Sequence, residues 1–74
     1  MVKMQYTDKT GYTLHLGFTA YPGFWSVYLR PEKRKTYRYI GQVKSIEGET
    51  NSQLFWRAFE EVIVNPVLAR RNAS

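Results

Sequence analysis

Apolar and polar residues alternate through the N-terminal part of the chain, which is the pattern of β-strands that bury one face. The alternation predicts strands over residues 12–19, 24–30 and 37–46, preceded by a short first strand over residues 2–6. Between the strands over residues 12–19 and 24–30, Pro22 supplies a fixed φ angle and Gly23 a positive φ angle, both of which a tight reversal needs. The pattern therefore predicts a meander of antiparallel strands joined by short turns.

The apolar face of each strand predicts which residues form the core. These faces carry Tyr12, Leu14, Leu16 and Phe18 in the strand over residues 12–19, and Trp25, Val27 and Leu29 in the strand over residues 24–30. In the strand over residues 37–46, it is ambiguous which face points to the core. Gly41 within this strand marks either a bulge or a close approach of another part of the chain. We expect Tyr39 and Val43 to point inward.

A helix is predicted after residue 50, where Thr50 and Gln53 have the spacing of a capping box. Its apolar half comprises Leu54, Phe55, Ala58, Phe59, Val62 and Ile63. Pro66 lacks an amide hydrogen and restricts Asn65, so the helix is expected to end there. Residues 67–74 then form a basic tail that is open to fraying. The expected fold is α+β, a single domain over residues 1–74 with a small antiparallel sheet of three or four strands packed on one C-terminal helix.

The composition excludes several classes of protein. A chain of 74 residues that is 43% hydrophobic is large enough for one core and too small for a multidomain enzyme. Because cysteine is absent, disulfides, thiol nucleophiles and thiolate metal sites are excluded, and a reducing, cytoplasmic location is expected. The longest aliphatic run is Val62-Ile63-Val64, far short of the ~20 residues that cross a bilayer, so no membrane partner is expected.

The positive charge of the chain is concentrated in one segment. The chain carries a net charge of +5, and residues 30–44 contain six basic residues against the single acid Glu32. A localised cationic patch favours a polyanionic partner. The alternative interpretation is a solvated hairpin whose charges prevent edge-to-edge aggregation.

The sequence offers little for catalysis, metal binding or a cofactor. His15 is the only histidine, and nothing in the spacing brings it to a serine nucleophile and an acid. The glycines do not form a phosphate-binding loop, and no spacing of acidic residues matches a metal site. We therefore expect a protein that is not an enzyme, with no catalytic residues, metal or cofactor.

Basic residues interleaved with tyrosines are the strongest candidate for a functional surface. The residues are Tyr28, Arg30, Lys33, Arg34, Lys35, Tyr37, Arg38 and Lys44. Lysine and arginine neutralise phosphates, and exposed tyrosines stack on bases or donate hydrogen bonds to phosphate oxygens. The pattern predicts a nucleic-acid-binding surface on two neighbouring strands and their connection.

Two segments of this region resemble a known DNA-binding family. Gly23-Phe24-Trp25-Ser26-Val27-Tyr28-Leu29-Arg30-Pro31 and Tyr39-Ile40-Gly41-Gln42-Val43, followed by an aromatic-rich helix, are similar to the AP2/integrase-type DNA-binding domain over roughly residues 23–59. The resemblance implies a three-stranded antiparallel sheet that is backed by one helix and lies in the major groove. It also implies that Arg30 contacts DNA, that Tyr37 and Tyr39 occupy contact-strand positions, and that Trp25 lies near the DNA backbone. We accordingly favour DNA over RNA as the partner.

The alternative is a small protein-interaction module, an inhibitor or assembly factor of a phage or mobile element. Phe24, Tyr28 and Trp56 would be its anchors, and its partner would be another protein or a second copy of the chain. Trp56 lies at the edge of the apolar half of the helix, where it either seals the core or anchors a partner. Exposure discriminates the two functions, because tyrosines beside cations favour nucleic acid and an apolar patch around Phe24 and Trp56 favours protein.

Overall fold

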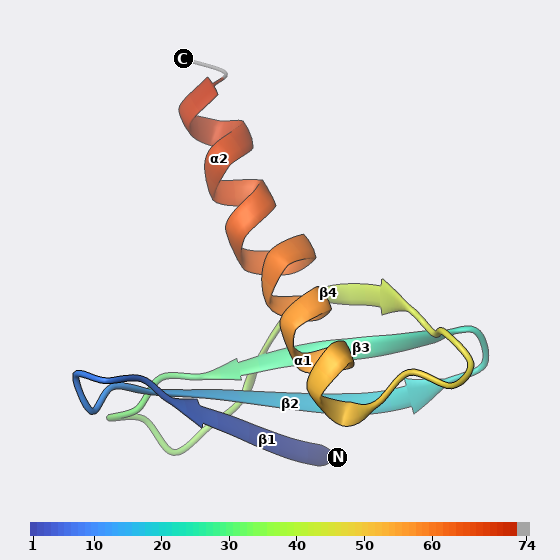
Figure 1. Ribbon diagram of the computed structural model, residues 1–74, viewed down its shortest axis with the longest axis horizontal. Helices are drawn as coiled ribbons and strands as arrows, with labels where there is room; N and C mark the ends of the chain where they lie inside the picture. The colour runs from blue at the N-terminus through green and yellow to red at the C-terminus, as the bar shows by residue number, and fades with distance from the viewer. Residues whose placement is uncertain (73–74) are drawn as a thin grey trace.

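A four-stranded antiparallel sheet carries one continuous helical segment across one face in the computed structural model, which describes residues 1–72 (Figure 1). The strands are β1 (Val2–Thr7), β2 (Thr13–Tyr21), β3 (Phe24–Arg30) and β4 (Arg38–Lys44), in the spatial order β1-β2-β3-β4. The helical segment consists of α1 (Asn51–Ala58), the π-helical η1 (Phe59–Val64) and α2 (Asn65–Asn72). The α+β class, the meander and the single C-terminal helical segment are therefore confirmed.

The core lies between the sheet and α1. Its buried residues are Leu16, Phe18, Val27, Val43, Leu54, Phe55 and Ala58. Trp25 packs against this cluster and meets the ring of Phe18 edge to face, with 6.3 Å between the ring centroids. The interpretation of Trp25 as a core residue is confirmed, whereas Phe59 is only half-buried and lies beside the ring of Trp56.

The inward orientation expected for Tyr39 is wrong, because a β-bulge changes the phase of β4. Val27 pairs with Gly41 but the next residue, Tyr28, pairs with Tyr39, which leaves Ile40 as the extra residue. A shift of one residue moves a side chain to the other face of a sheet. Tyr39 is consequently 56% exposed, while Ile40 and Val43 belong to the core side.

Gly41 lies at the bulge and also allows the helix to approach the sheet. A Cβ at this position would lie only 2.9 Å from Cγ1 of Val62, and the φ angle of Gly41 is +154°. Both meanings proposed for Gly41, a bulge and a close backbone approach, are confirmed. The absence of a side chain here sets how closely η1 packs on β4.

The helix does not end at Asn65-Pro66, so that expectation is wrong. The helix continues through α2 to Asn72, and residues 67–72 extend the helix instead of forming a separate tail. The reason is the π-helical turn before the proline, in which the amide of Asn65 donates to the carbonyl of Glu60, five residues back. The wider turn relieves the conflict between a proline ring and the preceding carbonyls. The last two residues, 73–74, lie outside the described residues.

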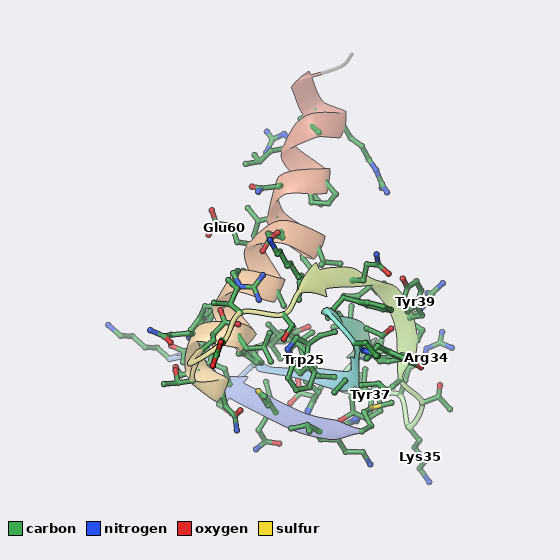
Figure 2. All side chains as sticks on the ribbon, turned by 90° about the vertical axis from the view of Figure 1, so that its right-hand side faces the viewer. Trp25, Arg34, Lys35, Tyr37, Tyr39 and Glu60 are labelled. Atoms are coloured by element: carbon green, nitrogen blue, oxygen red, sulfur yellow. The ribbon has the colours of Figure 1, made fainter. Side chains whose placement is uncertain are left out.

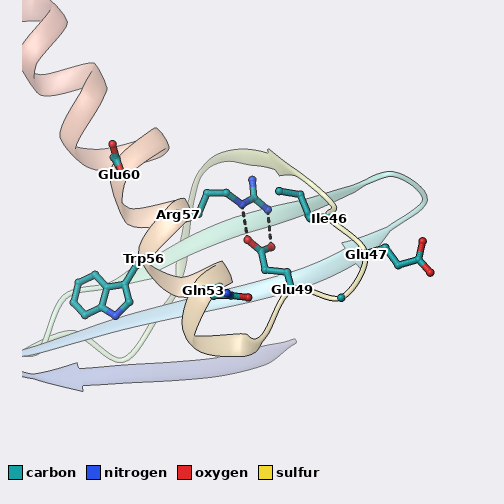
Figure 3. Close-up of a pocket in the computed structure, with 8 residues that line it drawn as sticks. Ile46, Glu47, Glu49, Gln53, Trp56, Arg57 and Glu60 are labelled. Carbon is teal, nitrogen blue, oxygen red and sulfur yellow. Dashed lines mark hydrogen bonds and ion pairs between the residues drawn. The ribbon is translucent and has the colours of Figure 1, made fainter.

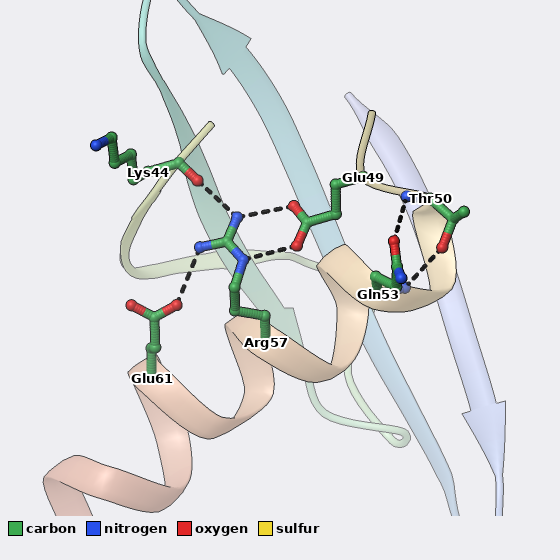
Figure 4. Close-up of polar contacts among 6 residues, drawn as sticks. All are labelled: Lys44, Glu49, Thr50, Gln53, Arg57 and Glu61. Carbon is green, nitrogen blue, oxygen red and sulfur yellow. Dashed lines mark hydrogen bonds and ion pairs between the residues drawn. The ribbon is translucent and has the colours of Figure 1, made fainter. Parts of the chain in front are cut away.

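The capping box at the start of α1 is present as predicted. Oγ1 of Thr50 accepts the amide hydrogen of Gln53 at 3.1 Å, and the amide of Thr50 donates to Oε1 of Gln53 at 2.9 Å (Figure 4). These two bonds satisfy backbone and side-chain groups that would otherwise be unpaired at the helix N-terminus. They fix the residue at which the helix begins.

Arg57 links the loop of residues 45–50 to the helix through hydrogen bonds and an ion pair (Figure 4). Its guanidinium donates to both carboxylate oxygens of Glu49, at 2.7 and 2.8 Å, and to the carbonyl of Lys44 at 2.6 Å. A further bond of 3.0 Å reaches Glu61. The hydrogen bonds from Arg57 hold the pKa of the Glu49 carboxyl below its usual value, and the bonds from Glu49 raise the pKa of Arg57.

Candidate nucleic-acid interface

The face of the sheet opposite the helix presents one continuous layer of polar and aromatic side chains. Residues that pair directly across an antiparallel ladder share a face, so the register defines this layer. It comprises Lys3, Gln5, Thr7, Thr13, His15, Gly17, Thr19, Tyr21, Phe24, Ser26, Tyr28, Arg30, Tyr39, Gln42 and Lys44. We call this layer the open face.

Within residues 1–72, no strand contains an acidic residue. The four strands carry the basic residues Lys3, Arg30, Arg38 and Lys44, whereas all six carboxylates lie in turns, loops or the helical segment. The acids nearest in sequence to the open face are Asp8, which follows Thr7 in the turn between β1 and β2, and Glu32, in the connection between β3 and β4. The open face therefore has a positive potential that is not offset by carboxylates on the four described strands.

Two pairs of aromatic rings lie on the open face. Tyr28 and Tyr39 face each other across β3 and β4 with 5.8 Å between ring centroids in an edge-to-face arrangement. Tyr21 and Phe24 flank the β2–β3 turn and are stacked, with centroids 5.1 Å apart and an angle of 10° between planes. Because Tyr39 and Tyr21 are about half exposed, each pair leaves a ring accessible to a flat ligand.

Tyr37 and Arg30 contact each other at the end of the open face that adjoins the connection between β3 and β4. The ring of Tyr37 has Nζ of Lys3 at 5.4 Å and Cζ of Arg30 at 5.9 Å from its centroid, within the range of cation–π contacts. Nη1 of Arg30 donates to the carbonyl of Arg34 at 2.7 Å, which closes the connection between β3 and β4. Tyr37 also lies above Gly17 beside Met1, where a β-carbon would overlap the methionine sulfur. Tyr37 and Arg30 thus have a structural role in shaping this end.

The predicted cations lie at both ends of the open face. Lys33, Arg34 and Lys35 are exposed in the connection that follows β3, and Figure 2 shows Arg34, Lys35 and Tyr39 along the outer side of this connection and β4. Lys44 pairs with Phe24 at the opposite end of β3. Seven extended residues span roughly 20 Å, so the cations bracket the aromatic rings over about that distance.

The structure does not bring every predicted residue to this surface. Arg38 pairs with Leu29, which places Arg38 on the face that carries the helix. The three proposed protein anchors are also divided, because Phe24 and Tyr28 lie on the open face whereas Trp56 is on α1. The remaining nucleic-acid candidates, Lys33, Arg34, Lys35 and Tyr37 included, lie on the open face or at its end.

Trp56 belongs to a second surface, between the helix and the β1–β2 edge. It is 42% exposed and meets Tyr6 edge to face at 4.8 Å between centroids. On one side lies a shallow hollow of about 520 Å³ formed with the 45–50 loop (Figure 3). On the other side lies an apolar groove of about 370 Å³, lined by Tyr6, Asp8, Tyr12, Leu14, Leu29, Trp56, Phe59 and Ile63. We call this second hollow the apolar groove.

Sequence reasoning missed Lys3, His15 and Tyr21 as members of the open face. Lys3 alternates with Val2 and Met4, so its face follows once β1 is known to pair with β2. His15 lies across from Gln5 on one side and Arg30 on the other. The alternation carried the signal for all three residues, but the strand order was needed to join them to the predicted cations.

Asp8 shapes the turn between β1 and β2. Its Oδ1 accepts hydrogen bonds from the hydroxyl of Thr10 at 2.6 Å and from the amides of Thr10 and Tyr12 at 2.9 and 3.1 Å. The hydrogen bond from the Thr10 side chain is the main cause that lowers the pKa of Asp8. This carboxylate is therefore committed to the turn.

Among residues 1–72, no three histidine, cysteine or acidic side chains gather as a potential metal site. No helix in the same part of the chain is long and apolar enough to cross a bilayer. The chain matches no protein-family model, no curated protein and no solved structure.

Proposed function

We propose that this protein is a non-enzymatic nucleic-acid-binding domain that uses the open face and the connection between β3 and β4. One observation carries the proposal: the described strands hold cations and exposed tyrosines on a face without carboxylates. Cationic side chains neutralise phosphates and aromatic rings stack on bases, so the combination suits a nucleic acid better than either feature alone. The resemblance of residues 23–59 to a DNA-binding family favours DNA over RNA.

The positions of the residues indicate separate roles. Lys33, Arg34 and Lys35 are exposed on long side chains that can follow a phosphate backbone, whereas Arg30 is bonded to the connection itself. Tyr39 is the most exposed ring of the surface and is the candidate for stacking. Arg30 and Tyr37 position these contacts.

The test is a salt titration of binding to short duplex and single-stranded DNA of random sequence, read by fluorescence anisotropy. The variant Lys33→Ala/Arg34→Ala/Lys35→Ala should weaken binding to every sequence about equally. It should also lower the slope of log affinity against log salt by up to roughly 3, because each cation releases about one counterion. Tyr39→Ala should weaken binding with little change in that slope, because a stacked ring releases few counterions.

A matched pair of single variants provides the control. Arg70 lies on α2, which projects away from the sheet (Figure 1), so Arg70→Ala should leave the slope nearly unchanged while Lys35→Ala lowers it by about 1. Absence of binding to any oligonucleotide at low salt would refute the function. An unchanged slope in the triple variant would refute the assignment of phosphate binding to the connection between β3 and β4.

A protein-interaction module is the second candidate, and the apolar groove beside Trp56 is the observation that favours it. Trp56, Tyr6 and Tyr12 are each at least 42% exposed around this groove, and such rings are typical anchors of protein interfaces. A partner captured by the wild-type chain and lost with Trp56→Ala would support this candidate. Nucleic-acid binding that is unaffected by Trp56→Ala would separate the two surfaces.

A further inference from the structure

The first strand, β1, forms one edge of the sheet. It stands at one end of the order β1-β2-β3-β4, and Figure 1 shows it along the rim of the sheet. All of its residues except Met4 are exposed. The outer side of an edge strand presents backbone amide and carbonyl groups to which a further strand can bind.

The two edges of the sheet differ in how well they can accept a further strand. The bulge in β4 leaves Ile40 as an extra residue, and a bulge at an edge disrupts further pairing. In contrast, β1 pairs with β2 in an unbroken register over its whole length. Its six residues include one charge, that of Lys3, and no proline. The structure therefore singles out β1 as the edge at which the sheet can be extended.

The hydrogen bonds of the β1–β2 hairpin show which backbone groups of β1 point outward. The amide of Asp8, directly after β1, donates to the carbonyl of Tyr12 at 2.9 Å. Alternate residues of an antiparallel strand bond to the same neighbour, so the even-numbered residues of β1 bond toward β2. The amides and carbonyls that point away from β2 belong to Lys3, Gln5 and Thr7.

A hollow of about 350 Å³ lies along the same edge, between β1 and the start of α1. Met4 and Tyr6 line it from β1, and Phe55 and Trp56 line it from α1. A strand added to β1 would place the side chains of its helix-facing side against this hollow. The edge therefore offers both backbone hydrogen bonds and apolar contacts to an incoming strand.

We propose that the incoming strand is β1 of a second copy of this chain, antiparallel to the first and related to it by a twofold axis at Gln5. Lys3 then pairs with Thr7 of the second copy, and Gln5 pairs with Gln5 of the second copy. Each outward-pointing residue of β1 donates one backbone hydrogen bond and accepts another in this register. Symmetry makes the two halves of the contact identical.

The residues of β1 suit this pairing with themselves. Lys3 lies opposite the neutral Thr7, so the one charge of the strand does not meet its own copy. Met4 lies opposite Tyr6 of the second copy on the side of the hollow, where a thioether packs favourably against an aromatic ring. An axis at Met4 would instead leave Thr7 opposite Met1, outside the strand, and would form fewer backbone bonds. Backbone bonding therefore selects the axis at Gln5.

The paired copies form one continuous sheet with both helical segments on the same side, because residues directly opposite each other in a ladder share a face. The two open faces consequently join into a single surface. A single pair of strands buries little area, so we expect a dissociation constant on the order of 10 to 100 µM. The pairing needs no nucleic acid, so its test is independent of the proposed function.

Self-association is measured by sedimentation velocity without nucleic acid, over concentrations on the order of 1 to 500 µM. The mass of the wild-type chain should rise from 8.7 kDa toward twice that value as the concentration increases. Gln5→Lys and Gln5→Glu should each weaken association by about fivefold, because each sets like charges opposite each other at the axis. An equimolar mixture of the two variants should associate more tightly than either alone, because opposite charges then face each other.

The variant Gln5→Pro tests the backbone bonds. Proline removes an amide that points away from β2, so the bonds between β1 and β2 are kept while pairing with a second copy is blocked. Association should fall by at least ~10-fold, and circular dichroism should show the wild-type fold. Gln42 provides the matched control, because it is an exposed glutamine on the open face of the other edge strand, β4. Gln42→Lys and Gln42→Glu should leave association unchanged.

Four results would overturn the proposal. The first is a monomeric wild type up to the highest concentration, and the second is a folded Gln5→Pro protein that associates like wild type. The third is a mixture of Gln5→Lys and Gln5→Glu that associates no more tightly than each variant alone. The fourth is an equal effect of the Gln42 substitutions, which would show that net charge and not the β1 edge governs association.

Discussion

Substitution of Gly41 tests how the sheet and the helix fit together. In Gly41→Ala, the new Cβ would lie 2.9 Å from Cγ1 of Val62, whereas carbon atoms pack best at about 3.5 to 4.0 Å. Val62 is β-branched and holds one χ1 rotamer in a helix, so it has little freedom to move aside. The helix must therefore shift by roughly 0.6 to 1 Å or the bulge must open, at a cost of about 1 to 3 kcal/mol.

The assay is thermal and urea unfolding of wild type, Gly41→Ala, Val62→Ala and the double variant. A loss of about 1 to 3 kcal/mol corresponds to a fall in melting temperature of roughly 4 to 20 °C for a domain of this size. Val62→Ala removes the atoms that the new methyl meets, so the double variant should be more stable than the sum of the single effects predicts, by at least ~0.5 kcal/mol. A Gly41→Ala protein as stable as wild type would refute the close approach, and strictly additive effects would refute Val62 as its cause.

Two further predictions concern the C-terminal end of the 45–50 loop. Thr50→Ala should destabilise the protein by about 1 kcal/mol in urea unfolding, because it removes the acceptor for the Gln53 amide, and an unchanged midpoint would contradict the capping role. Glu49→Gln should cost about 1 to 2 kcal/mol at pH 7, because its side chain is only 10% exposed and accepts two bonds from Arg57. The folded pKa of Glu49 is lowered, so this contribution is present above the ordinary glutamate pKa and is lost as the pH falls through the folded value. The difference between wild type and variant should stay constant from pH 7 to about pH 5 and shrink below about pH 4, and a difference that grows on acidification would contradict the pair.

Local patterns in the sequence determined most of the secondary structure and the core. The alternation of residues predicted β3 with its observed bounds and placed Leu16, Phe18 and Val27 in the core, because a strand with one buried face has a period of two. The capping box predicted the residue at which α1 begins, because the bonds of Thr50 and Gln53 lie within one helical turn. The signals used in these predictions act over a few neighbouring residues.

Only the tertiary structure decided the face of Tyr39, the extent of the helix and the composition of the open face. The sheet face on which Tyr39 lies depends on the bulge of β4 opposite β3. The helix continues past Pro66 because η1 is wound as a π-helix, a geometry that propensity rules do not anticipate. Lys3 and Lys44 are far apart in sequence, and they share a face because the register joins β1 to β4 through two intervening strands. A pairing register is a property of at least two segments, so a pattern read along one segment does not contain it.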